Sequence, residues 1–426
     1  MPVASVAAMR NAVTVPASSA APRPRDCEGC ADGVLLLHHH PIRAQAPDVI
    51  ESVRAFRRYS RFPVFTVNTR LGFPRGLAGL RFRAVVLHYT LFYSDFVPLT
   101  PAFRDYLDTC AGSYKIALFQ DEQAYTRDRF DFCDRYGIDS VYTLLAPEQF
   151  DAVYGRHTSV PRIVSYHPGY VGEHLVTAAR ELTKPDEQRR IDVGYRGRRL
   201  PEAWGAAARE KYEIADAFKH HAAGSGLVLD IETDEDKRIY GRGWYEFIAD
   251  CRGMLGTESG ASAFDMPDGS DAEIPYRTIS PRHLEAAAFR VCQILYEGHY
   301  SGVMEPDVHY IALRKDFSNF DDVMRQFRDP GRRAEIAQSA HRDLVASGDL
   351  SHARFVGAVD AELEAAGLRP SSEHAAAEVR RALYPSLPER RARGAVMALR
   401  DSSLPRPPVR AWASAVRGVG RSGGRG

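Results

Sequence analysis

The chain has 426 residues, of which 44% are hydrophobic and 26% charged, and its formal net charge is +1. That length exceeds what a single hydrophobic core supports, so we expect two domains with terminal extensions. The composition is that of an ordinary globular protein. It excludes a membrane-spanning helix, because no apolar run approaches the ~20 residues that such a helix needs.

The two ends of the chain differ from its body. Residues 1–32 lack a basic segment followed by an apolar stretch, so we predict a disordered tail, no secretory signal and a cytoplasmic protein. Residues 369–426 contain twelve arginines against four acidic residues, so this tail carries +8 and the rest carries −7. Its Pro, Gly, Ser and Ala content predicts a largely disordered segment. Such a tail suits peripheral contact with an anionic membrane. A solvated tail is the alternative, and the acidic body disfavours a nucleic-acid partner.

Between the tails, buried strands alternate with amphipathic helices. Residues 33–182 are predicted to form the first domain, with strands at 33–41, 62–69, 82–90, 114–122, 139–145 and 161–171, and helices at 48–60, 101–110, 127–137 and 147–157. Continuous apolar strands separated by helices of about 10–15 residues predict a parallel sheet that is covered on both faces.

The polar segment 183–190 is predicted to be a linker, and residues 191–368 repeat the same pattern. We expect strands at 191–197, 227–233 and 254–260, helices at 204–226 and 241–253, a helix, strand, loop and strand within 279–313, and helices at 316–329 and 331–347. The fold class is therefore α/β, with two Rossmann-like parallel-sheet domains facing across a cleft. Ligands of open parallel sheets bind beyond the carboxyl ends of the strands, so the cleft is the expected site.

Several common sites are absent from the sequence. No G-x-G-x-x-G motif follows the first strand of either half, and there is no Walker A loop, G-x-S-x-G elbow or H-E-x-x-H pair. Only Cys27 and Cys30 have ligand-like spacing, and one pair cannot complete a zinc site. Cys110, Cys133 and Cys251 are expected to be buried, reduced thiols. We expect no bound metal and no cofactor.

Polar residues gather instead at the predicted strand ends, at 38–40, 87–90, 119–123, 195–199, 256–262 and 296–302. Next to the last of these clusters, a helix with Ser280 as N-cap and Pro281 as first residue carries Glu285 near its first turn. Glu285 is either a surface charge favoured by the helix dipole or an acceptor of hydrogen bonds from a diol such as a ribose. In the second case, the loop 297–302 would present backbone N–H groups to phosphate oxygens.

The motifs of the second half resemble a known family. "IDVGYRGR", "GTESGAS", "SPRHLEAAAFRVCQILYEGHYSG" and "HYIALRKDFSNFDDV" are similar, in order and spacing, to the C-terminal domain of GT-B-fold glycosyltransferases. The resemblance is greatest to bacterial enzymes related to spore-maturation-type proteins. "KIALFQDEQAYTRDRFDFCDRYGIDSVYTLL" is similar to the acceptor-side half of the same group, so the resemblance covers roughly residues 33–363. It implies transfer of a sugar from a nucleotide-sugar donor to an acceptor hydroxyl, on a sugar, a lipid-linked glycan or a small molecule.

The resemblance also implies which residues hold the donor. Glu285 would bind the ribose, and Arg196, Arg198 and Lys211 would contact the diphosphate, because cationic forks and ammonium groups bind phosphate oxygens. The loop residues implied as donor contacts are Gly298, His299, Tyr300 and Ser301. A solvated surface charge is the alternative interpretation for each of the three cations.

One position departs from the family pattern. Many retaining members carry an acid eight residues before the ribose-binding glutamate, and Arg277 occupies that position here. The retaining assignment therefore does not carry over. Glu258 is the candidate acid near the sugar, and a helix N-terminal charge is its alternative.

The first domain would supply the acceptor contacts and a base. His88 follows a hydrophobic strand and is the candidate base, since histidine exchanges protons near neutral pH. A structural histidine is the alternative. Asp121 and Glu122 are rival acids for the acceptor hydroxyl, and His39 and His40 are expected on the acceptor side.

Cationic side chains at the diphosphate would stabilise the leaving group, so we expect transfer without a metal. Two alternatives share the fold: a nucleotide-sugar epimerase and a catalytically inactive GT-B-like nucleotide-binding module. An oxidoreductase is disfavoured, because both halves lack the glycine fingerprint.

Overall fold

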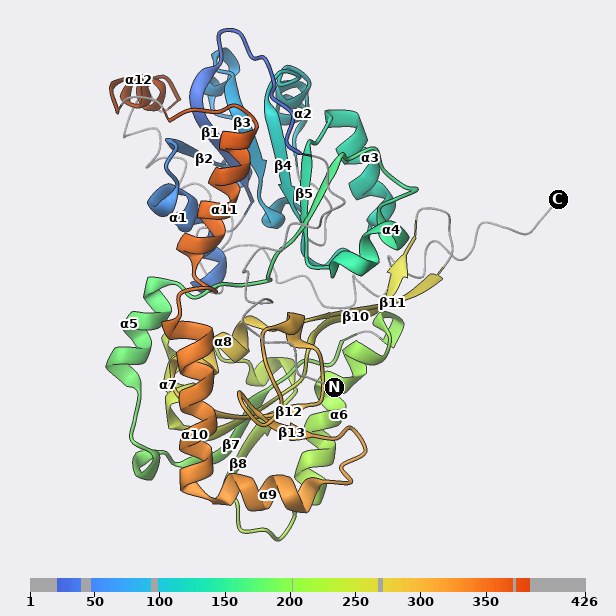
Figure 1. Cartoon of the computed structure of the whole chain (residues 1–426), viewed down its shortest axis with the longest axis vertical. Helices are drawn as coiled ribbons and strands as arrows, with labels where there is room; N and C mark the ends of the chain where they lie inside the picture. The colour runs from blue at the N-terminus through green and yellow to red at the C-terminus, as the bar shows by residue number, and fades with distance from the viewer. Residues whose placement is uncertain are drawn as a thin grey trace, which may run out of the picture.

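The structure is a computed structural model and describes residues 21–39, 47–92, 99–200, 202–266, 271–370 and 373–383. These residues form two domains, each built on a parallel sheet, with the first domain above the second in Figure 1. His40, the first twenty residues and most of the basic tail lie outside the described residues. Within the described ranges, no helix has both the length and the apolar character that crossing a membrane requires.

The first domain contains a six-stranded sheet in the order β2-β1-β3-β4-β5-β6, and every neighbouring pair is parallel. Its strands are β1 Ala31–His38, β2 Val64–Asn68, β3 Phe82–Leu87, β4 Tyr114–Leu118, β5 Ser140–Thr143 and β6 Arg162–Ser165. Its helices are α1 Pro47–Tyr59, α2 Pro101–Asp108, α3 Thr126–Tyr136 and α4 Phe150–Val153. Every residue of β4 is buried, as the prediction of a sheet covered on both faces requires.

The second domain contains a five-stranded parallel sheet in the order β13-β12-β9-β7-β8. Its strands are β7 Ile191–Arg196, β8 Leu229–Glu232, β9 Cys251–Gly256, β12 Cys292–Tyr296 and β13 Ile311–Leu313. Its helices are α6 Ala206–His221, α7 Arg242–Asp250, α8 Pro281–Ala288, α9 Phe320–Arg328 and α10 Pro330–His341. The predicted cap of α8 is confirmed, because the Ser280 side chain accepts a hydrogen bond from the Arg282 backbone N–H.

An antiparallel hairpin that the sequence did not reveal links the two domains. Strands β10 Ser259–Asp265 and β11 Asp271–Thr278 leave the second domain beyond β9 and pair with each other. Phe264, Ile274 and Tyr276 of this hairpin belong to the same hydrophobic core as the first sheet. The segment alternates poorly and contains Gly, Pro and Asp, which is why its periodicity does not predict the hairpin.

The chain crosses between the domains twice at one place. The first crossing precedes α5, Glu173–Leu182, and the second leads into α11, His352–Ala365. The two crossings pair through an isolated parallel bridge between Val171 and Ser351. The Val171 N–H donates to Leu350 O at 2.7 Å, and the His352 N–H donates to Val171 O at 3.1 Å.

Helix α11 packs on the first domain, although its sequence falls in the range expected for the second. Phe355, Val356, Val359 and Leu363 join the core of the first sheet, and Figure 1 shows α11 rising beside that sheet. The apolar side of α11 therefore completes the first domain. A further helix, α12 Glu373–Leu383, lies within the range expected as a tail and contacts the segment 75–79 of the first domain.

A buried carboxylate fixes α11 to the sheet. Glu362 accepts hydrogen bonds from the Tyr114 and Tyr142 hydroxyls, both at 3.0 Å, and from Arg162 Nε at 2.9 Å. Glu362 and Arg162 are 5% and 8% exposed, so this ion pair is almost completely desolvated. Both tyrosines belong to strands of the first sheet, β4 and β5, and Arg162 opens β6.

Candidate functional site

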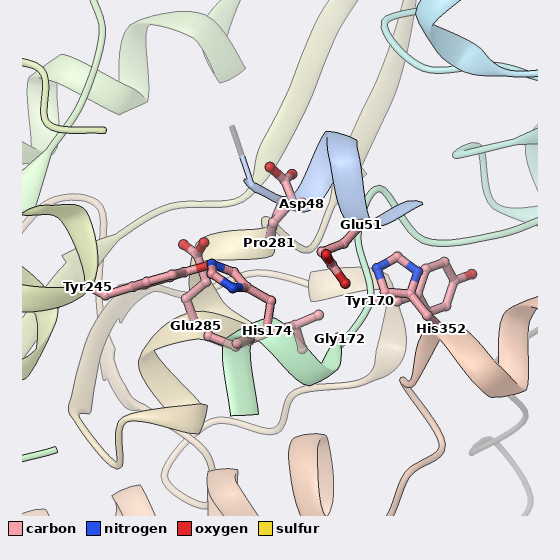
Figure 2. A pocket seen from close by; sticks show the side chains of 11 residues that line it. Asp48, Glu51, Tyr170, Gly172, His174, Tyr245, Pro281, Glu285 and His352 are labelled. Carbon is pink, nitrogen blue, oxygen red and sulfur yellow. The ribbon is translucent and has the colours of Figure 1, made fainter. Parts of the chain in front are cut away.

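Two adjoining pockets lie near the crossings: one is formed by both domains, and the other by the first domain, the first crossing and α11. They share Asp48 of α1, Tyr170 of the first crossing and His352 of α11. The pocket that faces the second domain, shown in Figure 2, has about 360 Å³ of unfilled space, counting its open mouth. It is lined by Asp48, Glu51, Tyr170, Gly172, His174, Leu175, Tyr245, Pro281, Leu284, Glu285 and His352. Glu285 therefore lies in a space formed by both domains.

The Glu285 carboxylate is held by a neighbouring indole. Trp244 Nε1 of α7 donates a hydrogen bond to Glu285 Oε2 at 2.8 Å. Burial raises the pKa of Glu285 to about 7, against the effect of the Trp244 hydrogen bond, and the nearby Asp48 raises it further. One carboxylate oxygen is fixed by the protein, and the side chain faces the interdomain pocket (Figure 2). This arrangement suits recognition of a diol.

A cluster of cations lies beyond the end of β7. Burial lowers the pKa of Lys211 on α6 to about 8; Asp121 opposes this, whereas Arg282, Arg198 and Arg277 lower the pKa further. All three arginines are close enough to Lys211 to disfavour its positive charge. No hydrogen bond or ion pair within the described residues engages the Lys211 amine. Concentrated positive charge of this kind is a ready site for a polyanion.

Arg277, at the position where the family pattern has an acid, is paired within the protein. Its guanidinium donates to both carboxylate oxygens of Glu210, and Lys315 Nζ donates to Glu210 Oε1 at 2.7 Å. Burial alone would raise the pKa of Glu210, but these two partners lower it. Glu210 therefore stays ionised beside Lys211 and offsets part of the positive charge of the cluster.

The two predicted arginines lie in different environments. Arg196 turns into the second domain, where it pairs with Asp230 at 2.8 Å and lies 4.3 Å from the Phe247 ring centroid. Arg198 is partly exposed and approaches Glu235 at 3.8 Å. Of the two arginines, only Arg198 lowers the pKa of Lys211.

Arg282, which sequence analysis did not single out, belongs to the cation cluster. Its guanidinium donates to the Arg196 carbonyl and lies 5.6 Å from the Trp244 ring. The detectable signal was its position, two residues after the N-cap Ser280, at the start of a helix that faces the cleft. Trp244, the partner of Glu285, carried no such signal, because its contact with α8 is formed only by the fold.

Asp121 and Glu122, adjacent in sequence, lie in opposite environments. Asp121 is exposed and lies near enough to Lys211 of the second domain to affect its pKa. Glu122 is 2% exposed and accepts hydrogen bonds from Thr143 Oγ1, from the Leu144 N–H and from the Tyr154 hydroxyl. Glu122 therefore stabilises the interior of the first domain, and its carboxylate is not presented to the cleft.

The Glu258 carboxylate is bound by the loop 297–302, which was expected to hold phosphate. Its Oε1 accepts hydrogen bonds from the backbone N–H groups of His299 at 3.0 Å and Tyr300 at 2.7 Å. Ser301 Oγ accepts from the Ile279 N–H at 3.0 Å, which ties the same loop to the start of α8. Tyr300 is fully buried. The loop thus already holds a carboxylate at the amides of His299 and Tyr300.

The close approach of Glu258 to Gly298 gives a testable result. A Cβ at position 298 would lie 2.6 Å from Glu258 Oε2, so Gly298→Ala should displace the carboxylate from one or both amides. Charge-assisted hydrogen bonds contribute about 1.5–3 kcal/mol each, so we expect a lower melting temperature in thermal unfolding. Gly357→Ala on α11, where a Cβ meets nothing within 4 Å, is the matched control and should be neutral or stabilising. Equal melting temperatures for the two variants would contradict this role of Glu258.

His88 is completely buried at the end of β3. Its Nδ1 lies 3.0 Å from Thr90 Oγ1 and accepts a hydrogen bond from the Thr90 backbone N–H, with 3.3 Å between the two nitrogens. Its Nε2 lies 3.0 Å from Ser52 Oγ. The Thr90 N–H requires an unprotonated Nδ1, so Nε2 carries the proton and donates to Ser52. His88 lines the second pocket in this tautomer. His39 Nδ1 lies 2.9 Å from Thr69 Oγ1 at the end of β2.

The arrangement of the cysteine, histidine and acidic side chains bears on metal binding. Throughout the described ranges, no three or more His, Cys, Asp or Glu side chains group as metal ligands would. Cys110, Cys133 and Cys251 are buried thiols, as predicted, and Cys292 is buried as well.

Comparison with known proteins identifies the fold. No protein-family model matches the sequence, and no relative was found among curated proteins. An alpha-glucosyltransferase solved with UDP-glucose and DNA containing an abasic site superimposes with a TM-score of 0.53 at 11% identity, over 78% of this chain and 98% of that one. The fold is of the GT-B type. Weaker likenesses include sucrose-phosphate synthase from Thermosynechococcus elongatus (TM-score 0.46, 11% identity, 78% and 99% coverage) and Anabaena HepE with UDP and glucose (0.44, 10%, 78% and 99%).

In this GT-B fold the two sheets face each other across the predicted cleft. Asp121, beyond β4, approaches Lys211 from the first domain, and a Cβ on Gly169, beyond β6, would lie 2.9 Å from Pro281 of α8. The carboxyl ends of both sheets thus meet at the same place, together with the cation cluster and Glu285. Of the predicted donor residues, the structure brings Glu285, Arg198 and Lys211 to this place and turns the Arg196 side chain away.

Proposed function

We propose that the protein is a glycosyltransferase that moves a sugar, of the hexosyl type, from a nucleotide-sugar donor to an acceptor hydroxyl. The observation that supports this most is the cation cluster around Lys211, whose amine has no partner in the described parts of the chain and which faces the cleft of a GT-B fold. A nucleoside diphosphate supplies the polyanion that such a cluster lacks. Within this class of enzymes, we also propose that the protein is related to the bacterial glycosyltransferases of the spore-maturation type.

Leaving-group stabilisation is the role we assign to the cluster. When the bond between the anomeric carbon and the diphosphate oxygen breaks, negative charge grows on the diphosphate, and Lys211, Arg198 and Arg282 are placed to stabilise it. These side chains supply the charge that a metal ion supplies in other transferases, so we propose transfer without a metal. The folded body of the chain carries net negative charge, and we propose a sugar, lipid-linked or small-molecule acceptor rather than nucleic acid.

Glu285 is proposed to select the nucleoside. With one oxygen held by Trp244, the ionised carboxylate accepts hydrogen bonds from the ribose hydroxyls. The α-glucosyltransferase that shares the fold was solved with UDP-glucose, so UDP is the first nucleotide to test. Asp48 and Glu51 of the first domain line the same pocket, so binding there favours the closed arrangement of the domains and excludes water from the donor.

A thermal-shift panel of UDP, GDP, CDP, ADP and dTDP tests this function. A nucleotide that binds only the folded chain must raise its melting temperature, and we expect a clear shift for one base. Glu285→Ala should abolish most of the shift, because the ribose loses its acceptor. Glu246→Ala, which removes an exposed carboxylate on the adjacent helix α7, is the control and should keep the full shift. If no nucleotide shifts the wild-type protein, the proposed function is wrong.

A further inference from the structure

His352 is a buried histidine whose ring has no hydrogen-bonding partner among the residues that the structure describes. It is 3% exposed, and neither Nδ1 nor Nε2 is hydrogen-bonded within the described residues. Leaving a buried polar group unpaired costs about 1–3 kcal/mol, so such groups normally mark a site that something else fills. The ring lines both pockets, and Figure 2 shows it beside Tyr170.

The second pocket contains another unpaired histidine nitrogen. His167 Nδ1, beyond the end of β6, has no partner in the part of the chain that the structure describes. This pocket has about 340 Å³ of unfilled space, counting its open mouth. It is lined by Asp48, Ser52, His88, Tyr89, Leu118, Gln120, Tyr166, His167, Pro168, Gly169, Tyr170, His352 and Phe355. Two histidines on separate segments, each with a ring nitrogen that lacks a partner among the described residues, therefore line one pocket.

The groups around these nitrogens restrict the chemistry of a ligand. Burial lowers the pKa of both His352 and His167 to about 4, so both rings are neutral and each pairs one donor with one acceptor. Asp48 lines the pocket. Glu51 lies beside His352, because a Cβ added to Gly172 would lie 3.6 Å from Glu51 Oε2 and 3.2 Å from His352 Cδ2. Among the described residues that line the two pockets there is no lysine or arginine.

These features favour a neutral ligand that both donates and accepts hydrogen bonds. A phosphate or carboxylate only accepts, and it would meet Asp48 and Glu51. A hydroxyl complements a neutral imidazole at either nitrogen and can also donate to a carboxylate. The stacked rings of Tyr170 and Phe355, 4.7 Å apart, add an apolar wall of the kind that covers the CH face of a sugar.

We propose that this pocket binds an uncharged sugar ring of the acceptor, with His352 and His167 bonding to its hydroxyls. The inference rests on the proposed glycosyl transfer, because it names the acceptor class for that reaction. The geometry connects the two substrates: the acceptor pocket shares Asp48, Tyr170 and His352 with the pocket that contains Glu285. A sugar bound at His352 therefore lies directly beside the proposed nucleoside site, next to His88.

The test measures binding of neutral sugars to the full chain, by thermal shift and calorimetry, in the presence and absence of UDP. The probes are glucose, galactose, mannose and N-acetylglucosamine, together with glucose 6-phosphate as a charged comparison. We expect at least one neutral sugar to bind, with its affinity reduced at least tenfold by His352→Phe, since two hydrogen bonds are lost. His352→Gln, which keeps a donor and an acceptor, should retain part of the affinity. His374→Phe, an exposed histidine of α12, should change nothing.

The outcomes separate this proposal from the proposed function. The UDP shift should survive His167→Phe, because His167 lines the second pocket and is not among the residues that line the Glu285 pocket. A normal UDP shift with no response to any neutral sugar, or a response to the sugar phosphate alone, would overturn the sugar assignment. Sugar binding that is unaffected by His352→Phe would overturn it as well, and would indicate that only water pairs with the ring. Sugar binding without any nucleotide shift would support the pocket assignment and show that the proposed glycosyltransferase function is wrong.

Discussion

Glu362→Ala is expected to destabilise the first domain by about 3–5 kcal/mol, because it leaves a buried arginine without its counter-ion. The substitution removes one carboxylate that serves Arg162 and two tyrosine hydroxyls. Since α11 is attached to the sheet partly through this carboxylate, the helix should loosen as well. Urea unfolding followed by circular dichroism measures the effect as a lower midpoint.

A neighbouring acid provides the control for this experiment. Glu364 lies on the same helix, 40% exposed, and pairs with the half-exposed Arg61 at 2.9 Å. Exposed pairs contribute about 0–1 kcal/mol, so Glu364→Ala should leave the midpoint nearly unchanged. If Glu362→Ala is equally mild, water must replace the lost carboxylate and the attachment of α11 must depend on apolar packing alone.

Lys211→Met is expected to weaken UDP binding by about 10–100-fold, the cost of losing one or two charge-assisted hydrogen bonds to phosphate. Calorimetry at pH 7.5 measures the change. Lys219→Met, which removes an exposed lysine from the same helix, is the matched control and should bind normally. Normal binding by Lys211→Met would show that the arginines alone hold the diphosphate.

The pKa values of Glu285 and Lys211 predict how the affinity for UDP depends on pH. Glu285, with its pKa near 7, accepts from ribose fully only when ionised, so affinity should rise as the pH increases through 7. Lys211, with its pKa near 8, loses its charge above that value, so affinity should fall as the pH increases through 8. UDP should therefore bind best between these values. Uridine, without phosphates, should show only the rise, and pyrophosphate only the fall. A flat profile for UDP would contradict both assignments.

Much of the fold could be predicted from local sequence. Strands such as β4 are continuously apolar, and the helices between them are amphipathic, so both parallel sheets follow from periodicity. The β10–β11 hairpin was missed because its apolar residues alternate weakly and are buried against the first domain, a partner far away in sequence. Likewise, α11 is an ordinary amphipathic helix, and nothing local indicates which domain it covers.

The site was predictable where residue type and strand position agree. Glu285 lies at the cleft because the helix that carries it starts there, and Lys211 because it lies in the first half of the helix that follows β7. Arg196 and Arg198 show the limit of such reasoning: they are two residues apart, yet the side chain of Arg196 turns away from the cluster and pairs with Asp230. The unpaired ring of His352 leaves no trace in the sequence, since only the fold determines which polar groups surround a side chain.

The position of α11 also affects how the protein can be made. The six strands of the first sheet emerge from the ribosome long before residue 352 is synthesised. Domains generally begin to fold as they emerge. Here Arg162, Tyr114 and Tyr142 cannot acquire their carboxylate until the whole second domain has been synthesised. The nascent first domain must therefore wait, partly uncovered, until the second domain and α11 have been synthesised. For the same reason, no single cut between the domains yields two complete halves.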